Sequence, residues 1–182
     1  VPGDMIVSRY PETYETAYQA VKKLTEIAPV YFSNGNHESR VSKVPVMQTE
    51  AFLEYENRVR KLGVHILNNA SEEVILHGGK FCISGLEIPL ECYGKGSYEP
   101  LPEHFIQEAL GEAKKDAVQI LLAHNPMFAK EYADWGADIT VCGHTHGGLV
   151  RIPGIGSVIS PQFELFPKYD TGDRKSTRLN SS

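Results

Sequence analysis

Two histidines near the end of the chain provide the clearest chemical signal in the sequence. His144 and His146 lie in the glycine-rich stretch 142–148, Cys-Gly-His-Thr-His-Gly-Gly, directly after the short apolar run 139–141. Residues two apart on an extended backbone project to the same side, so both imidazoles could address one small volume. The glycines allow the backbone to turn sharply and to approach a ligand closely. This pattern indicates a metal site.

Two other apolar runs also end in side chains of the kind that bind metals. Residues 29–32 lead into 33–38, Ser-Asn-Gly-Asn-His-Glu, and residues 118–123 lead into His124. In open α/β sheets the ligand crevice lies outside the carboxyl ends of the strands, so these residues are expected to converge with the His144 loop. Gly3-Asp4 would fit the same place if a strand preceded it.

Taken in order, these motifs resemble those of the calcineurin-like metallophosphoesterases. That family carries Asp-x-His, Gly-Asp, Gly-Asn-His-Glu or Asp, a lone His after a strand, and Gly-His-x-His. The last four are matched by residues 3–4, 35–38, His124 and 143–146, whereas Asp-x-His is missing from the chain. The resemblance covers nearly all of residues 1–172, and its last part is similar to a bacterial subgroup of membrane-associated phosphoesterases and phosphodiesterases.

The resemblance implies a centre of two divalent metal ions, which could be Mn, Zn or Fe. Asp4, Asn36, His124 and His144 would hold one ion, and Asp4 would bridge to a second ion that His146 also serves. The implied reaction is hydrolysis of a phosphoester bond, in a phosphodiester or a pyrophosphate, by hydroxide held by the two ions. Because the second position also needs the missing Asp-x-His pair, the chain by itself is expected to be inactive.

His37 is the candidate catalytic residue that would not bind metal. By the resemblance it would protonate the leaving alkoxide or stabilise the phosphoryl charge. One departure bears on it, since the family commonly has Gly-Asp-x-x-Asp and this chain has Val7 at the last position. Loss of such an outer carboxylate can weaken metal binding or activity about 10–100-fold, which leaves the orientation of His37 open.

Two other functions remain open from the sequence. The first is a catalytically silent metal-binding or regulatory module with the same fold, which an intact Asp-x-His about thirty residues before Asp4 would disfavour. The second is a structural zinc site built from Cys142, His144 and His146. It is the weaker alternative, because Asn36 and Asp4 are poor ligands for structural zinc.

Composition narrows the class of protein. The 182 residues predict one domain, and the net charge of −5 without a basic stripe argues against nucleic-acid binding. The three cysteines form no C-x-x-C pair, and no apolar run approaches the roughly 20 residues of a membrane-spanning helix. The expected partner is a small-molecule or lipid-linked phosphoester. The resemblance implies a cytoplasmic or membrane-associated location, with any membrane association through a segment before residue 1.

Hydrophobic spacing predicts the elements that must position these residues. Alternating helices and strands predict an α/β domain, and turns at Gly78 and Gly154 predict antiparallel hairpins. The resemblance implies a two-sheet β-sandwich flanked by helices and truncated at both ends, over residues 1–172. Residues 173–182 resemble a translated sequencing adapter and are excluded from the domain. Helices are predicted at 11–27, 48–62, 104–115 and 127–132, strands at 29–32, 64–67, 74–76, 81–83, 118–123 and 139–141, and a loop at 90–101.

Overall fold

The strands form a central sheet and two smaller pairs in the computed structural model, which describes residues 1–96, 99–170 and 172. The central sheet has the order β3-β4-β5-β6, with an antiparallel hairpin at β3 and β4 and parallel pairing from β4 to β6. Its strands are β3 (Ala70–Leu76), β4 (Gly79–Leu86), β5 (Val118–Ala123) and β6 (Ile139–Val141). β1 (Tyr31–Phe32) and β2 (His65–Ile66) form a parallel pair, and β7 (Val150–Ile152) and β8 (Gly156–Ile159) form a hairpin.

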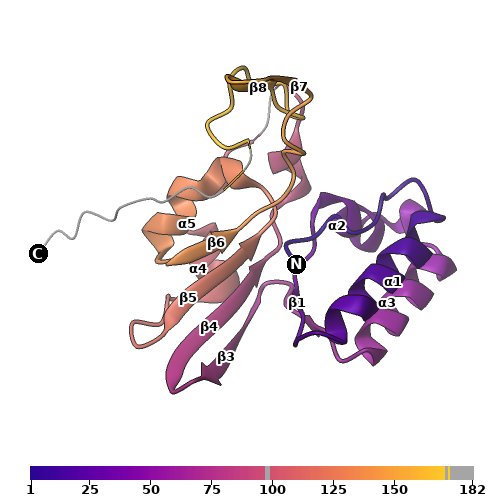
Figure 1. The fold of residues 1–182 in the computed structure, drawn as a ribbon, viewed down its shortest axis with the longest axis vertical. Helices are drawn as coiled ribbons and strands as arrows, with labels where there is room; N and C mark the ends of the chain where they lie inside the picture. Colours follow the sequence, from indigo (N-terminus) through magenta and orange to yellow (C-terminus); the bar gives the residue numbers. More distant parts are fainter. Residues whose placement is uncertain (97–98, 171, 173–182) are drawn as a thin grey trace, which may run out of the picture.

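The helices lie on both sides of this sheet, so the predicted α/β class with flanking helices is confirmed (Figure 1). On one side are α1 (Thr13–Thr25), α2 (Asn36–Lys43) and α3 (Glu50–Lys61). On the other are α4 (Phe105–Leu110) and α5 (Ala129–Trp135). The short 3-10 helices are η1 (Pro45–Met47), η2 (Leu90–Tyr93) and η3 (Pro126–Phe128).

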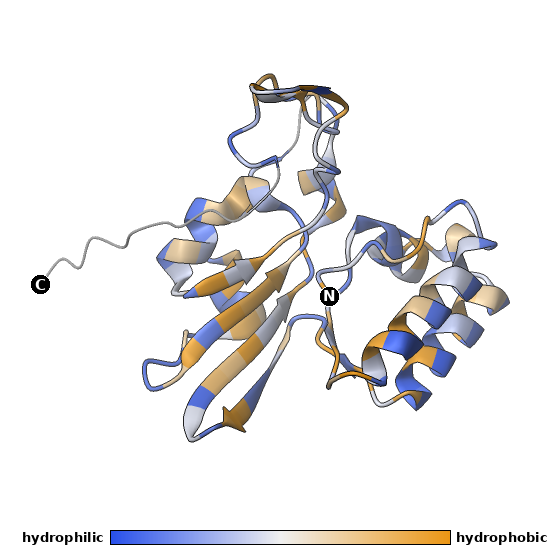
Figure 2. Ribbon diagram, viewed as in Figure 1, coloured by the Kyte–Doolittle hydropathy of each residue, from blue (hydrophilic) through white to orange (hydrophobic). Residues whose placement is uncertain are grey.

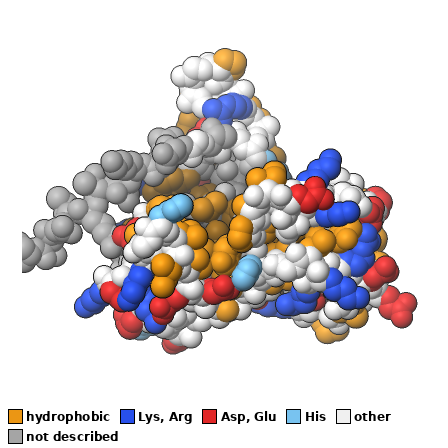
Figure 3. Space-filling view, turned by 60° about the horizontal axis from the view of Figure 1, so that its bottom comes forward, with side chains coloured by type: hydrophobic (Ala, Val, Ile, Leu, Met, Phe, Trp, Pro, Cys, Tyr) orange, Lys and Arg blue, Asp and Glu red, His pale blue; other side chains and the backbone are white. Residues whose placement is uncertain are grey.

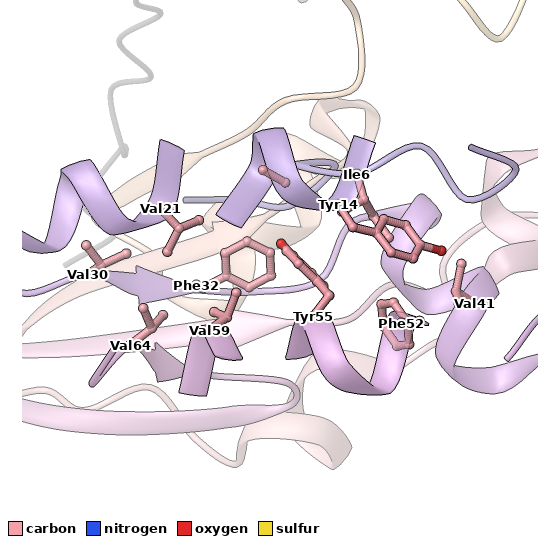
Figure 4. Close-up of a cluster of buried hydrophobic side chains, with 11 residues drawn as sticks. Ile6, Tyr14, Val21, Val30, Phe32, Val41, Phe52, Tyr55, Val59 and Val64 are labelled. Atoms are coloured by element: carbon pink, nitrogen blue, oxygen red, sulfur yellow. The ribbon is translucent and has the colours of Figure 1, made fainter. Parts of the chain in front are cut away.

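α1 and α3 pack their apolar faces against β1 (Figure 4). Tyr14 and Val21 of α1, two turns apart, are both buried. α3 begins at a Thr49 cap, whose hydroxyl accepts a hydrogen bond from the Phe52 N–H, and it buries Phe52 and Tyr55. The rings of Tyr14 and Tyr55 are 5.6 Å apart, so aromatic contacts join the two helices.

A second core lies on the other side of the sheet, where β4 and β5 meet α4 and α5. Leu86 and Leu121 are completely buried against Tyr132 and Trp135 of α5. Figure 2 shows apolar residues along β4 and β5, which pack against α4 and α5 on one face. These two strands therefore form a rigid base for the residues that follow them.

An apolar groove of about 360 Å³ lies between the β1 side and the central sheet. Ile83, Ile120 and Leu122 line it from the sheet, and Leu24 and Ile27 line it from the end of α1. Figure 3, which turns the lower side of the molecule forward, shows apolar side chains gathered between the β1 side and the central sheet.

Several predicted elements have different limits in the structure. Helix α2, over Asn36–Lys43, was not among the predicted helices, and it contains the Asn-His-Glu part of the second motif. The helix predicted to reach Lys115 ends at Leu110, because Gly111 has a φ of 74°, a typical glycine stop. The short helix predicted from Met127 is divided into η3 and α5.

Parts of two predictions fall outside the described residues. Residues 97–98 belong to the predicted loop, and 173–182 form the predicted adapter tail. Within the described residues, no helix combines the length and apolar character needed to cross a membrane.

Candidate metal centre

Three predicted ligands meet beyond the ends of adjacent strands. His124 directly follows β5 and His144 follows β6, and these strands are parallel neighbours whose ends lie together. Asp4 joins them from the first residues, which run beside β1 because Ser33 N–H donates a 3.0 Å hydrogen bond to the Val1 carbonyl. The ligand atoms of Asp4, His124 and His144 all lie within 4.8 Å of one another. The expected convergence of strand ends is thus present for His124 and His144, whereas Asp4 reaches them from a segment that is not a strand.

The hydrogen bonds of His124 fix its tautomer. Its Nδ1 is 2.8 Å from the carbonyl oxygen of Pro2, which can only accept, so Nδ1 carries the proton. In the neutral ring, Nε2 then presents a lone pair, and this atom lies 2.9 Å from Asp4 Oδ2. Within the described part of the chain, Nε2 makes no hydrogen bond of acceptable geometry. Two facing electron donors at this distance suit a cation that both can bind, with the carbonyl orienting the imidazole.

Two other buried atoms that can bind a metal ion also lack a hydrogen-bond partner in the part of the chain that the structure describes. Asn36 Oδ1 and His144 Nε2 are buried and have no hydrogen-bond partner among the described residues. Buried polar atoms without partners are rare in proteins and costly to maintain. Burial also lowers the pKa of His144 to about 4, so the imidazole is neutral at pH 7, as metal binding requires. A divalent cation would satisfy both atoms.

Asp4 is held in position by close packing of two backbone segments. A Cβ on Gly3 would collide with the backbone of Gly35, and a Cβ on Gly35 would collide with the Asp4 side chain. Asp4 itself has a φ of 55°, an unusual conformation for a residue other than glycine. Its Oδ1 accepts a 2.8 Å hydrogen bond from His37 N–H, while Oδ2 faces His124. Burial raises the pKa of Asp4, whereas the hydrogen bond and charge of a protonated His124 and the hydrogen bond from His37 N–H lower it, and the net pKa is lowered.

The carboxylate of Glu38 holds the turn that carries Asp4. It accepts hydrogen bonds from the backbone N–H groups of Asp4 and Met5, both at 2.8 Å, and of Gly35 at 3.1 Å. Ile6 N–H lies 3.3 Å from the same group. Burial raises the pKa of this carboxyl, so its place in the interior depends on these donors. From the sequence Glu38 could be considered only as a local capping residue, because most of its partners are more than thirty residues away.

His37 lies beside the centre, with its orientation fixed by Ser8. Ser8 N–H donates a 3.0 Å hydrogen bond to His37 Nδ1, and Ser8 Oγ is also 3.0 Å from that nitrogen. Nδ1 is therefore the acceptor, and the proton of the neutral ring is on Nε2. Burial lowers the pKa of His37, which favours the neutral form. The sequence left the orientation of His37 open, because Val7 replaces the usual aspartate. In the structure Ser8 fixes this orientation.

His146 differs from the other predicted ligands. Its side chain is exposed, and it lies outside the group formed by Asp4, His124 and His144. The expectation of an extended loop is wrong, because His144 and His146 have φ values of 66° and 52°. Cys142 also lies outside that group, and burial raises its thiol pKa to about 12, which gives the zinc alternative no support.

Tyr93 belongs to the site but was not predicted from the sequence. Its ring centroid is 5.0 Å from that of His144, edge to face, and 6.2 Å from that of His124. It comes from η2, inside the stretch predicted as a loop that could cover the cleft. A tyrosine in a segment rich in Gly, Pro and Tyr gives no periodic signal, so only the packing identifies it. It restricts the rotation of both imidazoles.

Comparison with known proteins agrees with the motifs and the geometry. The model of the calcineurin-like phosphoesterase family matches residues 1–148. The Caenorhabditis elegans protein named "Putative metallophosphoesterase F40B5.2" is 32% identical over 124 residues, which cover 65% of this chain and 23% of that protein. The phosphodiesterase YaeI of Escherichia coli is 24% identical over 159 residues, which cover 87% of this chain and 52% of that protein.

The matched region is only part of each relative. The uncharacterized protein YpbG of Bacillus subtilis is 31% identical over 117 residues, covering 59% of this chain and 41% of that protein. The chain thus spans about half or less of the length of these relatives. No solved structure matches it significantly. The family match extends over most of the chain and includes every residue of the centre, so the chain belongs to the calcineurin-like phosphoesterase family.

Proposed function

We propose that this chain forms the metal-binding part of a hydrolase that cleaves phosphoesters, either phosphodiesters or pyrophosphates. The observation that carries the proposal is the grouping of Asp4, His124 and His144, whose ligand atoms all lie within 4.8 Å of one another. The buried Asn36 Oδ1, which has no hydrogen-bond partner among the described residues, supports it. Oxygen and imidazole donors together suit Mn²⁺, Zn²⁺ or Fe²⁺.

The chain's own residues would arrange the reacting groups. Bound divalent ions would supply Lewis-acid activation of water and of a phosphoryl oxygen. Asn36 adds no charge to the ligand set, so a bound cation stays electrophilic, whereas Asp4 offers a second oxygen that can bridge. Tyr93 keeps the imidazoles of His124 and His144 in place, which limits reorganisation during the reaction.

The hydrogen bonds of His37 favour one of its two expected roles. His37 can transfer a proton to a leaving group only when both ring nitrogens are protonated. Nδ1 already accepts a hydrogen bond from Ser8 N–H, which opposes its protonation. The neutral ring can still donate a hydrogen bond from Nε2. We therefore assign His37 to stabilising phosphoryl charge through that N–H, rather than to protonating the leaving alkoxide. In the whole protein, His37→Gln should then keep more turnover than His37→Ala.

A second ion would need ligands in addition to those grouped here. Asp4 can bridge two ions, and His146 is exposed and lies two residues after His144 in the sequence. The Asp-x-His pair expected from the family resemblance is not in this chain. We propose that the chain alone binds one ion and is nearly inactive. A version extended to include that pair should hydrolyse bis(p-nitrophenyl) phosphate in the presence of Mn²⁺, acting in nature on a small or lipid-linked phosphoester.

The test measures metal content and hydrolysis in the same extended protein. His146→Ala should reduce the number of bound ions from two to one and remove most hydrolysis, because two ions place the attacking and leaving oxygens. His37→Ala should lower kcat and leave the metal content unchanged.

The exposure of His146 and the presence of Val7 favour the silent module as the second candidate. An extended protein that binds two ions but hydrolyses no phosphodiester, pyrophosphate or nucleotide would establish that function instead.

A further inference from the structure

A cavity of about 150 Å³ opens directly beside the metal centre. His144 and Thr145 line it from the loop after β6, and Met127 lines it from η3. The remaining wall is the segment 160–169, which includes Gln162, Glu164 and Lys168. Nothing in the hydrolytic mechanism proposed above uses this segment.

The wall is attached firmly to the centre. Thr145, between the two histidines, donates a 2.8 Å hydrogen bond from Oγ1 to the Asp170 carbonyl, two residues beyond Lys168. Gln162 is buried, and its Nε2 donates to the Cys92 carbonyl at 3.2 Å while its Oε1 accepts from Asn125 at 3.3 Å. The cavity therefore has a fixed place relative to His144.

Lys168 provides a positive charge that the described part of the chain does not neutralise. No hydrogen bond or ion pair to its Nζ is present among the described residues, and its nearest aromatic contact is the Tyr169 ring at 5.2 Å. The neighbouring cation, Arg151, is different, because its Nη1 is 3.0 Å from Asp170 Oδ2. An unpaired ammonium on the wall of a cavity beside a phosphoester centre suits a second phosphate.

Glu164 restricts what the rest of the ligand can be. Its carboxylate lines the same cavity and forms no ion pair with Lys168 within the described residues. A carboxylate repels a bare polyphosphate but accepts hydrogen bonds from hydroxyl or amino groups. The wall therefore matches a ligand that combines a phosphate with a sugar or a nucleoside.

We propose that this cavity binds the part of the substrate beyond the reacting phosphorus, with Lys168 on a second phosphate and Glu164 on hydroxyl groups. The preferred substrate is then a pyrophosphate-linked sugar or nucleoside rather than a simple phosphodiester. This inference rests on the proposed hydrolytic function, since it places the reacting phosphate at Asp4, His124 and His144.

Calorimetric titration with AMP and ADP, at a constant concentration of free Mn²⁺, tests the role of Lys168 by binding alone. ADP should bind about tenfold more tightly than AMP, because a single charge-assisted contact is worth about that factor. Lys168→Met should remove this preference and leave AMP binding unchanged, whereas Lys168→Arg should retain it. Lys95→Met is the matched control, an exposed lysine beside Phe163 that does not line the cavity, and it should change neither affinity.

A second variant tests the role of Glu164. Glu164→Gln should weaken AMP binding several-fold and leave inorganic phosphate binding unchanged, because AMP carries ribose hydroxyl groups that inorganic phosphate lacks. Thermal unfolding of each variant shows that it is folded.

The outcomes separate this inference from the function on which it rests. Metal-dependent AMP binding with an unchanged ADP preference in Lys168→Met would overturn the cavity assignment alone. Equal AMP affinity in the wild type and His144→Ala would overturn the proposed function.

Discussion

His144 and His146 are two residues apart, yet they lie in very different surroundings. His144 Nε2 is buried and has no hydrogen-bond partner in the part of the chain that the structure describes, and its ring contacts Tyr93. Its neighbours Asp4 and His124 are fixed by hydrogen bonds to the backbone. His146 is exposed and lies outside their group. The difference indicates that the described residues form one candidate metal position, at Asp4, His124 and His144. We propose that His146 contributes to a second. Three changes around His144 test this difference.

The largest effect is expected from Glu38→Gln. The amide would replace one of the two oxygens that hold the backbone N–H groups of Asp4 and Met5 with a donor, so the Asp4 turn would loosen. Mn²⁺ affinity should fall about 10–100-fold, the range typical of groups that orient metal ligands. Glu72→Gln, at a half-exposed glutamate paired with His65, should leave the affinity unchanged. A Glu38→Gln protein with normal Mn²⁺ affinity would show that the turn does not need this carboxylate.

Asn36→Ala should separate metal binding from stability. Because Asn36 Oδ1 has no hydrogen-bond partner among the described residues, its removal should change the free energy of unfolding of the metal-free protein by less than about 1 kcal/mol. Mn²⁺ affinity should fall about tenfold, since a ligand is lost. Urea unfolding in EDTA and calorimetry measure the two quantities. A large loss of metal-free stability would instead make Asn36 a structural residue.

A third effect concerns the pH dependence of stability. His144 has a folded pKa of about 4 against a usual value of 6.5, so between these values the unfolded chain binds a proton that the folded chain does not. The free energy of unfolding of the metal-free protein should therefore fall as pH drops from 6.5 to 4, by up to about 1.4 kcal/mol per pH unit.

His144→Asn should remove that contribution, whereas His146→Asn should keep it. Urea unfolding in EDTA across this pH range gives the slopes. Equal slopes in the two variants would contradict the difference in burial.

The residue types predicted the metal centre better than the local structure around it. Converging strand ends predict that His124 and His144 lie together, a rule that depends only on finding the strands, whereas Asp4 was added through the family resemblance. Helix α2 was missed because its first residues were assigned to a ligand loop, although Glu38 at the third helical position is itself a helix-start signal. The alignment of His144 with His146 failed because φ values near 60° cannot be seen in a sequence.

Contacts between segments distant in the sequence could not be predicted. Glu87, at the end of β4, accepts hydrogen bonds from Asn34 at 3.0 Å and Ser39 at 2.8 Å, and it pairs with Lys43 at 2.7 Å. These contacts tie α2 to the central sheet. The partners lie more than forty residues from Glu87, and no periodicity links them.

Calorimetric titration of the chain with Mn²⁺ tests whether one ion binds at Asp4, His124 and His144. The structure predicts one bound ion per chain, with binding lost in His144→Ala and kept within about threefold in His146→Ala, because only the first removes a grouped ligand. Two bound ions, or equal affinity in the wild type and His144→Ala, would contradict it.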